Sequence, residues 1–229
     1  YHPREDHQLK SLSRLIDIYY ESVGRNANLL LNFPVDRSGR IASADSARIM
    51  EWRRALDAEF AHDLFAEAQA TADNVRGGAC RFSAAKAVDG RADTYWATDD
   101  GVTAATLSLQ FERPRRVNRI LLQEYIPLGQ RVGRFAVEWL DGDTWRPVET
   151  AEEMTTIGYK RIIRFAGVTT PALRVRFGQA RGPLCISNVG AYDAPVLLEE
   201  PRIVRNGAGE VTLAAGDTQA EIRYTLDGT

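Results

Sequence analysis

The chain has 229 residues, 44% hydrophobic and 26% charged, a composition typical of globular domains and long enough for two small ones. No run of about 18 apolar residues occurs, so the sequence predicts no membrane-spanning helix. The net charge of −2 favours neither nucleic acid nor an anionic membrane as a partner.

The first forty residues predict a loop, a helix and then a strand. Helical spacing indicates one buried face, formed by Leu12, Leu15, Ile16, Tyr19 and Val23. Ser11 and Ser13 can cap or enter this helix, and Gly24 is suited to the left-handed position that ends a helix. Residues 28–32 (NLLLN) do not alternate with polar residues, which predicts a strand buried on both faces. This order is that of one repeat of an α/β barrel or a doubly wound sheet.

Residues 44–63 predict a second amphipathic helix, which would be the last helix of the barrel, with Ser43 as its N-cap. Between the two predicted helices, Arg25 and Asn26 are expected to pin the turn before the strand, because Arg has five donors for loop carbonyls.

From about residue 66 to 194 the apolar runs are short and alternating, with turn residues between them, which predicts a β-sandwich. Residues 141–144 (DGDT) predict a hairpin. The tryptophans expected to fill the sandwich core are Trp96, Trp139 and Trp145. Cys80 and Cys185 have no nearby His partner for a metal site; they either form a disulfide worth roughly 4–5 kcal/mol or are two buried thiols.

The motifs YHPRED (1–6) and GRNANLLLNFPVDRSGRI (24–41) resemble the last barrel repeat of glycoside hydrolase family 29, the α-L-fucosidases. The pattern is long and therefore specific. The resemblance implies a retaining mechanism with an Asp nucleophile and a Glu acid/base. Glu5 matches the acid/base, with Asp6 as an adjacent rival, and the nucleophile is expected to lie on an earlier strand outside this chain.

The same resemblance implies substrate contacts at the mouth of the barrel. Phe33 matches the aromatic residue that lies against the apolar face of the sugar, and Asn32 precedes it at the strand end. His2 flanks the acid and either binds a sugar hydroxyl or is a surface histidine. From the residues alone, Glu5 and Asp6 are also explained as a solvated pair before a helix, favoured by roughly 0.3–1 kcal/mol.

The middle segment resembles the discoidin-like, galactose-binding-like fold of coagulation-factor C-type domains and family 32 carbohydrate-binding modules. Its most specific element is A-x-D-G-x-x-x-T-x-W at residues 87–96. The resemblance implies a structural calcium ion at positions matched by Lys86, Asp89, Arg91, Thr94 and Asn188. Asn188 replaces a family Glu, which should weaken an all-oxygen site, and Asp89 is alternatively the cap of its own turn.

Sugar binding by this module would need an aromatic platform beside polar groups. The loop between two predicted strands offers Tyr125, Gln130 and Arg131 for that purpose. Docking of the same loop onto the barrel is the alternative. From Pro195 onward, alternation and the turn pairs NG and DG predict a further β unit, which resembles the small β-sandwich at the C-termini of hexosaminidases.

The sequence therefore predicts three parts: residues 1–64, the C-terminal segment of a catalytic (β/α) barrel; residues 65–194, a discoidin-like β-sandwich; and residues 195–229, the start of a second small β-sandwich. The predicted function is the C-terminal portion of a retaining exo-α-L-fucosidase, acting on fucosylated oligosaccharides with α-1,3/1,4 branches. The alternative is a non-catalytic carbohydrate-binding module. No cofactor is required, the missing part of the barrel is a partner, the isolated chain is expected to be inactive, and the expected location is periplasmic or secreted.

Overall fold

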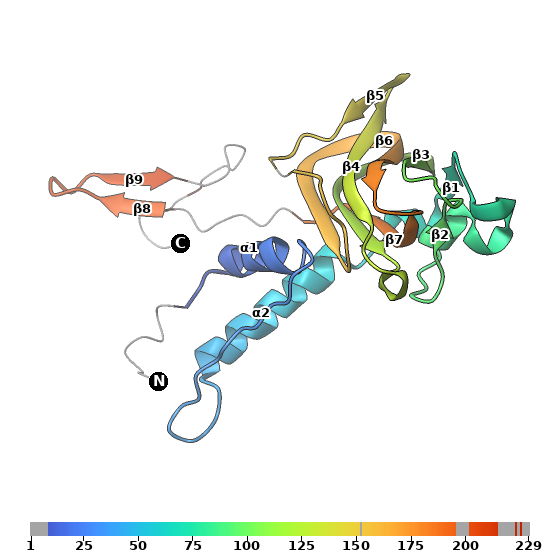
Figure 1. The fold of residues 1–229 in the computed structure, drawn as a ribbon. Helices are drawn as coiled ribbons and strands as arrows, with labels where there is room; N and C mark the ends of the chain where they lie inside the picture. Colours follow the sequence, from blue (N-terminus) through green and yellow to red (C-terminus); the bar gives the residue numbers. More distant parts are fainter. Residues whose placement is uncertain (1–8, 152, 196–201, 215–222, 224, 226–229) are drawn as a thin grey trace.

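The computed structural model describes residues 9–151, 153–195, 202–214, 223 and 225, and a β-sandwich forms its centre (Figure 1). Seven antiparallel strands lie in the order β2-β7-β3-β6-β4-β5, with β1 paired to β3. The strands are β1 (Gln69–Ala72), β2 (Trp96–Ala97), β3 (Ala105–Glu124), β4 (Val132–Asp141), β5 (Thr144–Pro147), β6 (Arg161–Ala180) and β7 (Cys185–Tyr192). The predicted sandwich is thus confirmed.

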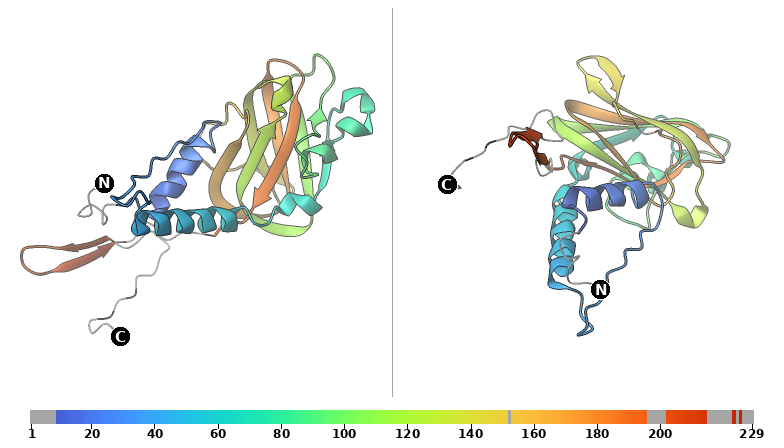
Figure 2. Two further views of the ribbon diagram at one scale, coloured as in Figure 1. Left: turned by 90° about the horizontal axis from the view of Figure 1, so that it is seen from below. Right: turned by 90° about the vertical axis from the view of Figure 1, so that its left-hand side faces the viewer.

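Two 20-residue strands, β3 and β6, bend the sheet so that its parts face each other across the core (Figure 2). Their mutual pairing shifts register between Gln110 and Arg115 and again between Val117 and Arg119. Before the first shift β3 also pairs with β1, and after the second it pairs with β7. The sequence predicts only short runs in this part of the chain, because polar residues at the bends of the long strands interrupt the alternation.

The three sandwich tryptophans have three different environments. Trp96 is fully buried in the core, and its indole Nε1 donates to the carbonyl of Asn74 at 2.9 Å. Trp139 is partly buried against the core, whereas Trp145 lies outside it with the Arg174 guanidinium 4.4 Å from its ring centroid. The prediction is right for Trp96 but wrong for Trp145, because the short edge strand β5 turns this side chain outward.

The predicted hairpin at residues 141–144 is confirmed. Strand β4 ends at Asp141, strand β5 begins at Thr144, and the two residues pair across the turn. Gly142 has φ 59°, which only glycine adopts readily. The cysteines are both free, Cys80 exposed and Cys185 buried, so the structure has neither the disulfide nor two buried thiols.

Short 3-10 helices connect the strands: η2 (Leu64–Glu67), η3 (Arg76–Gly78), η4 (Cys80–Phe82), η5 (Ala84–Ala87) and η6 (Ile126–Leu128). The first of them fixes the entrance to the sandwich. The Asp63 carboxylate accepts hydrogen bonds from Phe65 N at 2.9 Å and from Ala191 N at 3.0 Å, joining η2 to β7. Burial raises the pKa of this carboxyl above its usual value.

Helix α1 (Leu12–Ser22) confirms the first predicted helix, and Ser11 is its N-cap, accepting from Arg14 N at 3.2 Å. Its buried residues include Ile16 and Tyr20, which pack on the outer face of the sheet. The sheet residues in this second cluster are Leu121, Ile162 and Tyr192. The helix is therefore fixed to the back of the sandwich, as Figure 2 shows.

Gly24 does not adopt the predicted left-handed conformation; the residue after the helix with positive φ is Asn26, at 63°. Glycine is needed at position 24 for a different reason. A Cβ there would lie 2.6 Å from the carbonyl oxygen of Tyr20, closer than real Cβ contacts allow. The small residue lets the chain turn directly against the end of α1.

Helix α2 (Ser43–Glu59) confirms the second predicted helix, but it ends before residue 63 and its N-cap is Ala42, so Ser43 is not the cap. It packs on α1 and on the sheet through aromatic residues: the Phe60 ring lies edge-on to Tyr192, with centroids 5.1 Å apart. Among the described residues no helix is long and apolar enough to cross a bilayer.

Residues 28–32 do not form the predicted buried strand. No described segment pairs with them, and Leu30 is 86% exposed. A strand needs neighbours that satisfy its backbone and cover its side chains, and none is available in the described part of the chain. The nearby pairings in the described part of the chain are two isolated bridges, between Arg25 and Arg161 and between Val35 and Ile41.

A separate two-stranded sheet, β8 (Arg202–Arg205) and β9 (Val211–Ala214), follows the sandwich (Figure 1). Its turn is closed by Asn206, whose side-chain oxygen accepts from Ala208 N at 3.0 Å and Glu210 N at 2.9 Å. Ile203 and Val211 remain exposed. The predicted β unit is therefore present as a hairpin, and the second turn pair, DG at residues 227–228, lies outside the described residues.

Candidate functional site

The predicted catalytic carboxylates, Glu5 and Asp6, lie outside the described residues, as does His2. The two other residues assigned to the sugar pocket, Asn32 and Phe33, lie in the extended segment that follows the turn at residues 24–26. Asn32 is exposed and Phe33 is half-buried. What the structure describes in detail is how this segment and helix α1 are attached to the sandwich.

A buried polar cluster attaches α1 and α2 to the sheet. The Tyr20 hydroxyl donates to the Glu59 carboxylate and accepts from Arg119 Nε at 2.9 Å. Glu59 is only 3% exposed, so this pairing compensates the cost of burying its charge. Burial raises the pKa of the Tyr20 hydroxyl well above its usual range. Arg164 lies over the Tyr20 ring at 4.4 Å and its NH1 atom lies 2.7 Å from Asp17 Oδ1.

A second attachment involves the turn at residues 24–26. The Gly24 carbonyl accepts from Ile162 N at 2.8 Å, and Asn26 Oδ1 accepts from Tyr159 N at 2.7 Å. Asn26 Nδ2 donates to Gln130 Oε1 at 3.3 Å. Contacts with the sandwich therefore hold this turn in place. The sequence predicted that the turn is held, but it did not identify the sandwich as the partner.

In the loop proposed for sugar binding, the side chain of Arg131 is used to hydrogen-bond backbone carbonyls. The Arg131 guanidinium donates to the carbonyls of Leu128, at 3.0 and 3.2 Å, and Pro183, at 2.9 Å. Tyr125 stacks on Tyr95 with centroids 4.3 Å apart, which covers one of its faces. Arg131 thus organises the loop, while Tyr125 is partly buried and stacked on Tyr95.

Glu124 was missed by sequence reasoning, although it lies next to the proposed loop. Its carboxylate is 3% exposed and accepts from the backbone nitrogens of Arg131 at 2.6 Å, Val132 at 2.9 Å and Gly158 at 2.7 Å. Three backbone donors stabilise a carboxylate in a buried position. Glu124 therefore ties the loop at 125–131 to the turn at 157–159.

Four of the five predicted metal-site residues form a connected group at the rim of the sandwich, whereas the fifth, Asn188, donates to Gln123 instead. The Thr94 hydroxyl donates to the Asp89 carboxylate, with O–O distances of 2.7 and 2.8 Å, and Lys86 Nζ lies 3.3 Å from Asp89 Oδ2. The Arg91 backbone nitrogen donates to Asp89 at 3.1 Å, while its guanidinium pairs with Asp93. Asp89 therefore caps its own turn, the alternative that the sequence left open.

A small cavity of about 210 Å³ brings together residues that the sequence assigned to different roles. It is lined by Arg91 and Asn188 from the metal set and by Tyr125 from the sugar set. Two further lining residues, Gln123 and Tyr159, were not predicted. We call this cavity the rim pocket.

Hydrogen bonds order the floor of the rim pocket. Asn188 Nδ2 donates to Gln123 Oε1 at 3.1 Å, and Gln123 Nε2 donates to the Tyr159 carbonyl at 2.9 Å. The Tyr159 side chain is 66% exposed at its edge. Amide groups beside aromatic rings are a chemistry that suits a sugar or a polar peptide.

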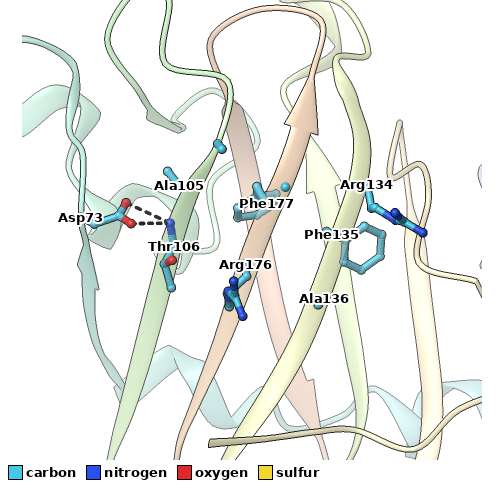
Figure 3. A pocket seen from close by; sticks show the side chains of 10 residues that line it. Asp73, Ala105, Thr106, Arg134, Phe135, Ala136, Arg176 and Phe177 are labelled. Atoms are coloured by element: carbon cyan, nitrogen blue, oxygen red, sulfur yellow. Dashed lines mark hydrogen bonds between the residues drawn. The ribbon is translucent and has the colours of Figure 1, made fainter.

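A larger open hollow of about 580 Å³ lies over β3, β6 and β4, away from every predicted residue (Figure 3). Its floor includes the buried rings of Phe135 and Phe177, and Arg134 lies at its side. Its other charged groups are engaged: Asp73 accepts from Thr106 N at 2.9 Å, and Arg176 NH1 lies 3.2 Å from a Glu138 oxygen. The hollow is a feature of the sheet surface, and few of its polar groups are free to bind a ligand.

The antiparallel sandwich with the A-x-D-G-x-x-x-T-x-W loop at its rim is that of a discoidin-like domain. Residues 68–188, about half of the chain, match the F5/8 type C domain family, and the chain belongs to this family.

Beyond this domain, the chain is homologous to the C-terminal part of family 29 α-L-fucosidases. It is 36% identical over 185 residues to "Putative alpha-L-fucosidase 1" of Oryza sativa subsp. japonica, a match that covers 80% of this chain and 35% of the relative. It is 31% identical over 187 residues to "Alpha-L-fucosidase 1" of Arabidopsis thaliana, covering 80% and 36%. The chain therefore spans about a third of the length of these curated relatives.

Among solved structures, the chain is similar to the Ruminococcus gnavus GH29 fucosidase E1_10125 in complex with fucose. The TM-score is 0.75 at 32% identity, and the match covers 81% of this chain and 37% of that one. The matched region is larger than the sandwich alone, so the similarity extends beyond the F5/8 type C segment.

Proposed function

We propose that this chain is the C-terminal portion of a retaining exo-α-L-fucosidase, in which it supplies the last repeat of a (β/α) barrel and an attached discoidin-like sandwich. The observation that carries the proposal is a set of exposed apolar side chains on the non-sandwich part of a chain homologous to fucosidases. Its most exposed members are Leu30, Val35, Ile41 and Met50. Exposed side chains of this kind indicate a partner that covers them, and the remaining repeats of a barrel are such a partner.

Within this proposal Glu5 is the acid/base, with Asp6 as the alternative. A retaining glycosidase needs a second carboxyl group about 5–5.5 Å away, which acts as nucleophile. The proton donor must also have a pKa near neutrality, which burial beside an apolar group provides. Phe33 would lie against the apolar face of fucose, and Asn32 would donate or accept a hydrogen bond at a sugar hydroxyl.

The nucleophile is assigned to a part of the enzyme outside this chain, so these residues alone are proposed to be inactive. An α-1,3/1,4 linkage and a periplasmic or secreted location belong to the same proposal.

A second candidate function is saccharide binding by the sandwich. The observation in its favour is the rim pocket, where Tyr125 and Tyr159 lie beside the amide groups of Gln123 and Asn188. Arg131 is a poorer candidate for sugar contact, because its donors are used by loop carbonyls.

Calcium binding at the rim is a separate proposal. The Asp89 carboxylate and the Thr94 hydroxyl are hard oxygen donors that already lie together, which fits Ca²⁺. Lys86 on the carboxylate and an amide in place of a Glu at Asn188 both reduce the negative charge at the site. Calcium would therefore be held weakly, and its role would be to fix the loop.

The test of the main proposal is hydrolysis of an aryl α-L-fucoside by the complete enzyme that contains this chain. Glu5→Gln is expected to reduce kcat by about 100-fold or more, because Glu5 no longer protonates the leaving oxygen or activates the water that hydrolyses the covalent intermediate. If Glu5 is the proton donor, Asp6→Asn is the matched control and should leave kcat nearly unchanged. If Asp6 is the donor, Asp6→Asn should reduce kcat and Glu5→Gln should not. Unchanged rates in both variants would overturn the assignment.

The saccharide-binding candidate is tested separately by glycan-array binding of the 229-residue chain. Binding of fucosylated or galactosylated probes that Tyr159→Ala abolishes would support it, and silence with all probes would favour a docking role.

A further inference from the structure

The side chain of Asn26, an exposed residue, bridges two loops of the sandwich. Its Oδ1 accepts from Tyr159 N at 2.7 Å and its Nδ2 donates to Gln130 Oε1 at 3.3 Å. Gly158 lies directly against the same amide, because a Cβ at position 158 would overlap Asn26 Nδ2, Cγ and Oδ1. Gly158 also has φ 65°. Both residues are therefore adapted to each other across 132 positions of sequence.

The contact continues into the sandwich as an unbroken series of hydrogen bonds. Gly158 N donates to the buried carboxylate of Glu124 at 2.7 Å, and its carbonyl accepts from Glu124 N at 2.9 Å. The Tyr159 carbonyl accepts from Gln123 Nε2 at 2.9 Å. The turn that receives Asn26 is thus held by strand β3 and cannot shift without breaking buried bonds.

The other side of Asn26 leads toward the residues assigned to the sugar. Six residues of extended chain separate it from Phe33, and this segment has no described strand partner of its own. Its nearest fixed points are the bond from Ala27 N to the Ser22 carbonyl of helix α1 at 2.9 Å and, from the sandwich, the Ile162 N bond to Gly24 and the Asn26 amide. The sandwich therefore holds the start of the segment that leads to Asn32 and Phe33, together with the end of α1.

We propose that Asn26 is a positioning residue for fucose binding, and that the sandwich acts as an internal clamp on the sugar-contacting segment; this rests on the proposed fucosidase function. The clamp requires no saccharide on the sandwich itself. It gives the sandwich a role in the reaction at the barrel, because a small displacement of substrate-contacting groups costs a large factor in rate or affinity.

The test uses the complete enzyme with an aryl α-L-fucoside as substrate and fucose as competing ligand. Asn26→Gly keeps the positive φ and removes the side chain, so it isolates the amide contacts. We expect KM and the inhibition constant of fucose to rise about tenfold. Asn26→Asp, which keeps the acceptor for Tyr159 N, is expected to retain most of the affinity. Unchanged KM and inhibition constant in Asn26→Gly would overturn the proposal.

Gly158→Ala tests the same contact from the opposite side. It introduces a side chain into the Asn26 amide at a positive φ, whereas Gly142→Ala introduces one at φ 59° with nothing within 4 Å. Both variants place an alanine at a positive φ, so the backbone strain is similar in the two. A rise in KM that occurs only in Gly158→Ala is therefore caused by the steric clash with the Asn26 amide. Equal KM in the two variants would count against the clamp.

Two controls separate failure of the clamp from failure of the proposed function. An unmodified enzyme without fucosidase activity would refute the function. In the 229-residue chain, hydrogen exchange at the amides of Tyr159 and Ile162 measures the clamp independently of activity. Faster exchange in Asn26→Gly, with the sandwich core still protected, is expected. Exchange identical to the unmodified chain would overturn the clamp whatever the enzyme does.

Discussion

Tyr20→Phe is expected to loosen the attachment of helix α1 to the sandwich. The substitution removes one hydroxyl and leaves the ring, so the packing of Arg164 over the ring is preserved. It deprives the Glu59 carboxylate, 3% exposed, of its hydroxyl donor and deprives Arg119 Nε of its acceptor. The change therefore isolates a polar contact in a dry environment.

The magnitude follows from what is left unpaired. A buried polar group without a partner costs about 1–3 kcal/mol, and a charged one costs more. With one charged acceptor and one cationic donor affected, the free energy of unfolding should fall by about 2–4 kcal/mol. Tyr159→Phe, at a residue 66% exposed, is the control and should change it by less than about 0.5 kcal/mol.

Urea unfolding of the 229-residue chain at pH 7 measures these differences, with the denaturant slope checked for each variant. Adding Glu59→Leu to Tyr20→Phe should recover part of the loss, because it removes the stranded carboxylate. Equal stability of Tyr20→Phe and Tyr159→Phe would refute the reasoning, as would a double variant that loses the full sum of the single effects.

Three further outcomes are expected. Trp96→Ala should lower the free energy of unfolding by about 3–5 kcal/mol because it empties the core, whereas Trp145→Ala should cost far less; urea unfolding that ranks them equally would contradict this. Backbone and side-chain hydrogen bonds hold the pKa of the Asp99 carboxyl below its usual value of 3.8, so its stabilising effect is complete above that value and is lost as pH falls through the lowered pKa. The stability difference between the unmodified chain and Asp99→Asn should accordingly shrink in acid, and a difference that grows below pH 4 would be inconsistent with it. Millimolar CaCl₂ should raise the melting temperature of the unmodified chain but not of Asp89→Asn or Thr94→Val; the same shift in all three would argue against the rim site.

Local chemistry was sufficient to predict the parts of this fold that depend on nearby residues. The alternating runs gave the sandwich, the spacing around Leu15 gave helix α1, and residues 141–144 gave a hairpin. The Asp89 turn was also anticipated, because an Asp followed by Gly is explained by hydrogen bonds within a few residues.

Other predictions failed where the outcome depends on distant neighbours. Residues 28–32 have the composition of a buried strand, but composition cannot supply the strands that would cover it, and Leu30 is exposed. The Gly24 prediction failed for a local reason instead: the glycine is needed because it lies close to the carbonyl of Tyr20, four residues earlier, and not because its backbone is left-handed.

The amino-acid sequence by itself determined the two helices, the β-sandwich, the family resemblance and the identity of the acidic and aromatic residues proposed to act on fucose. Only the tertiary structure decided which of these parts touch. Asn26 and Gly158 are 132 residues apart, and neither carries a local pattern that points to the other. Their contact exists because the turn that leads into strand β6 lies against the end of helix α1, and a pairing created by chain topology has no trace in the spacing of either segment.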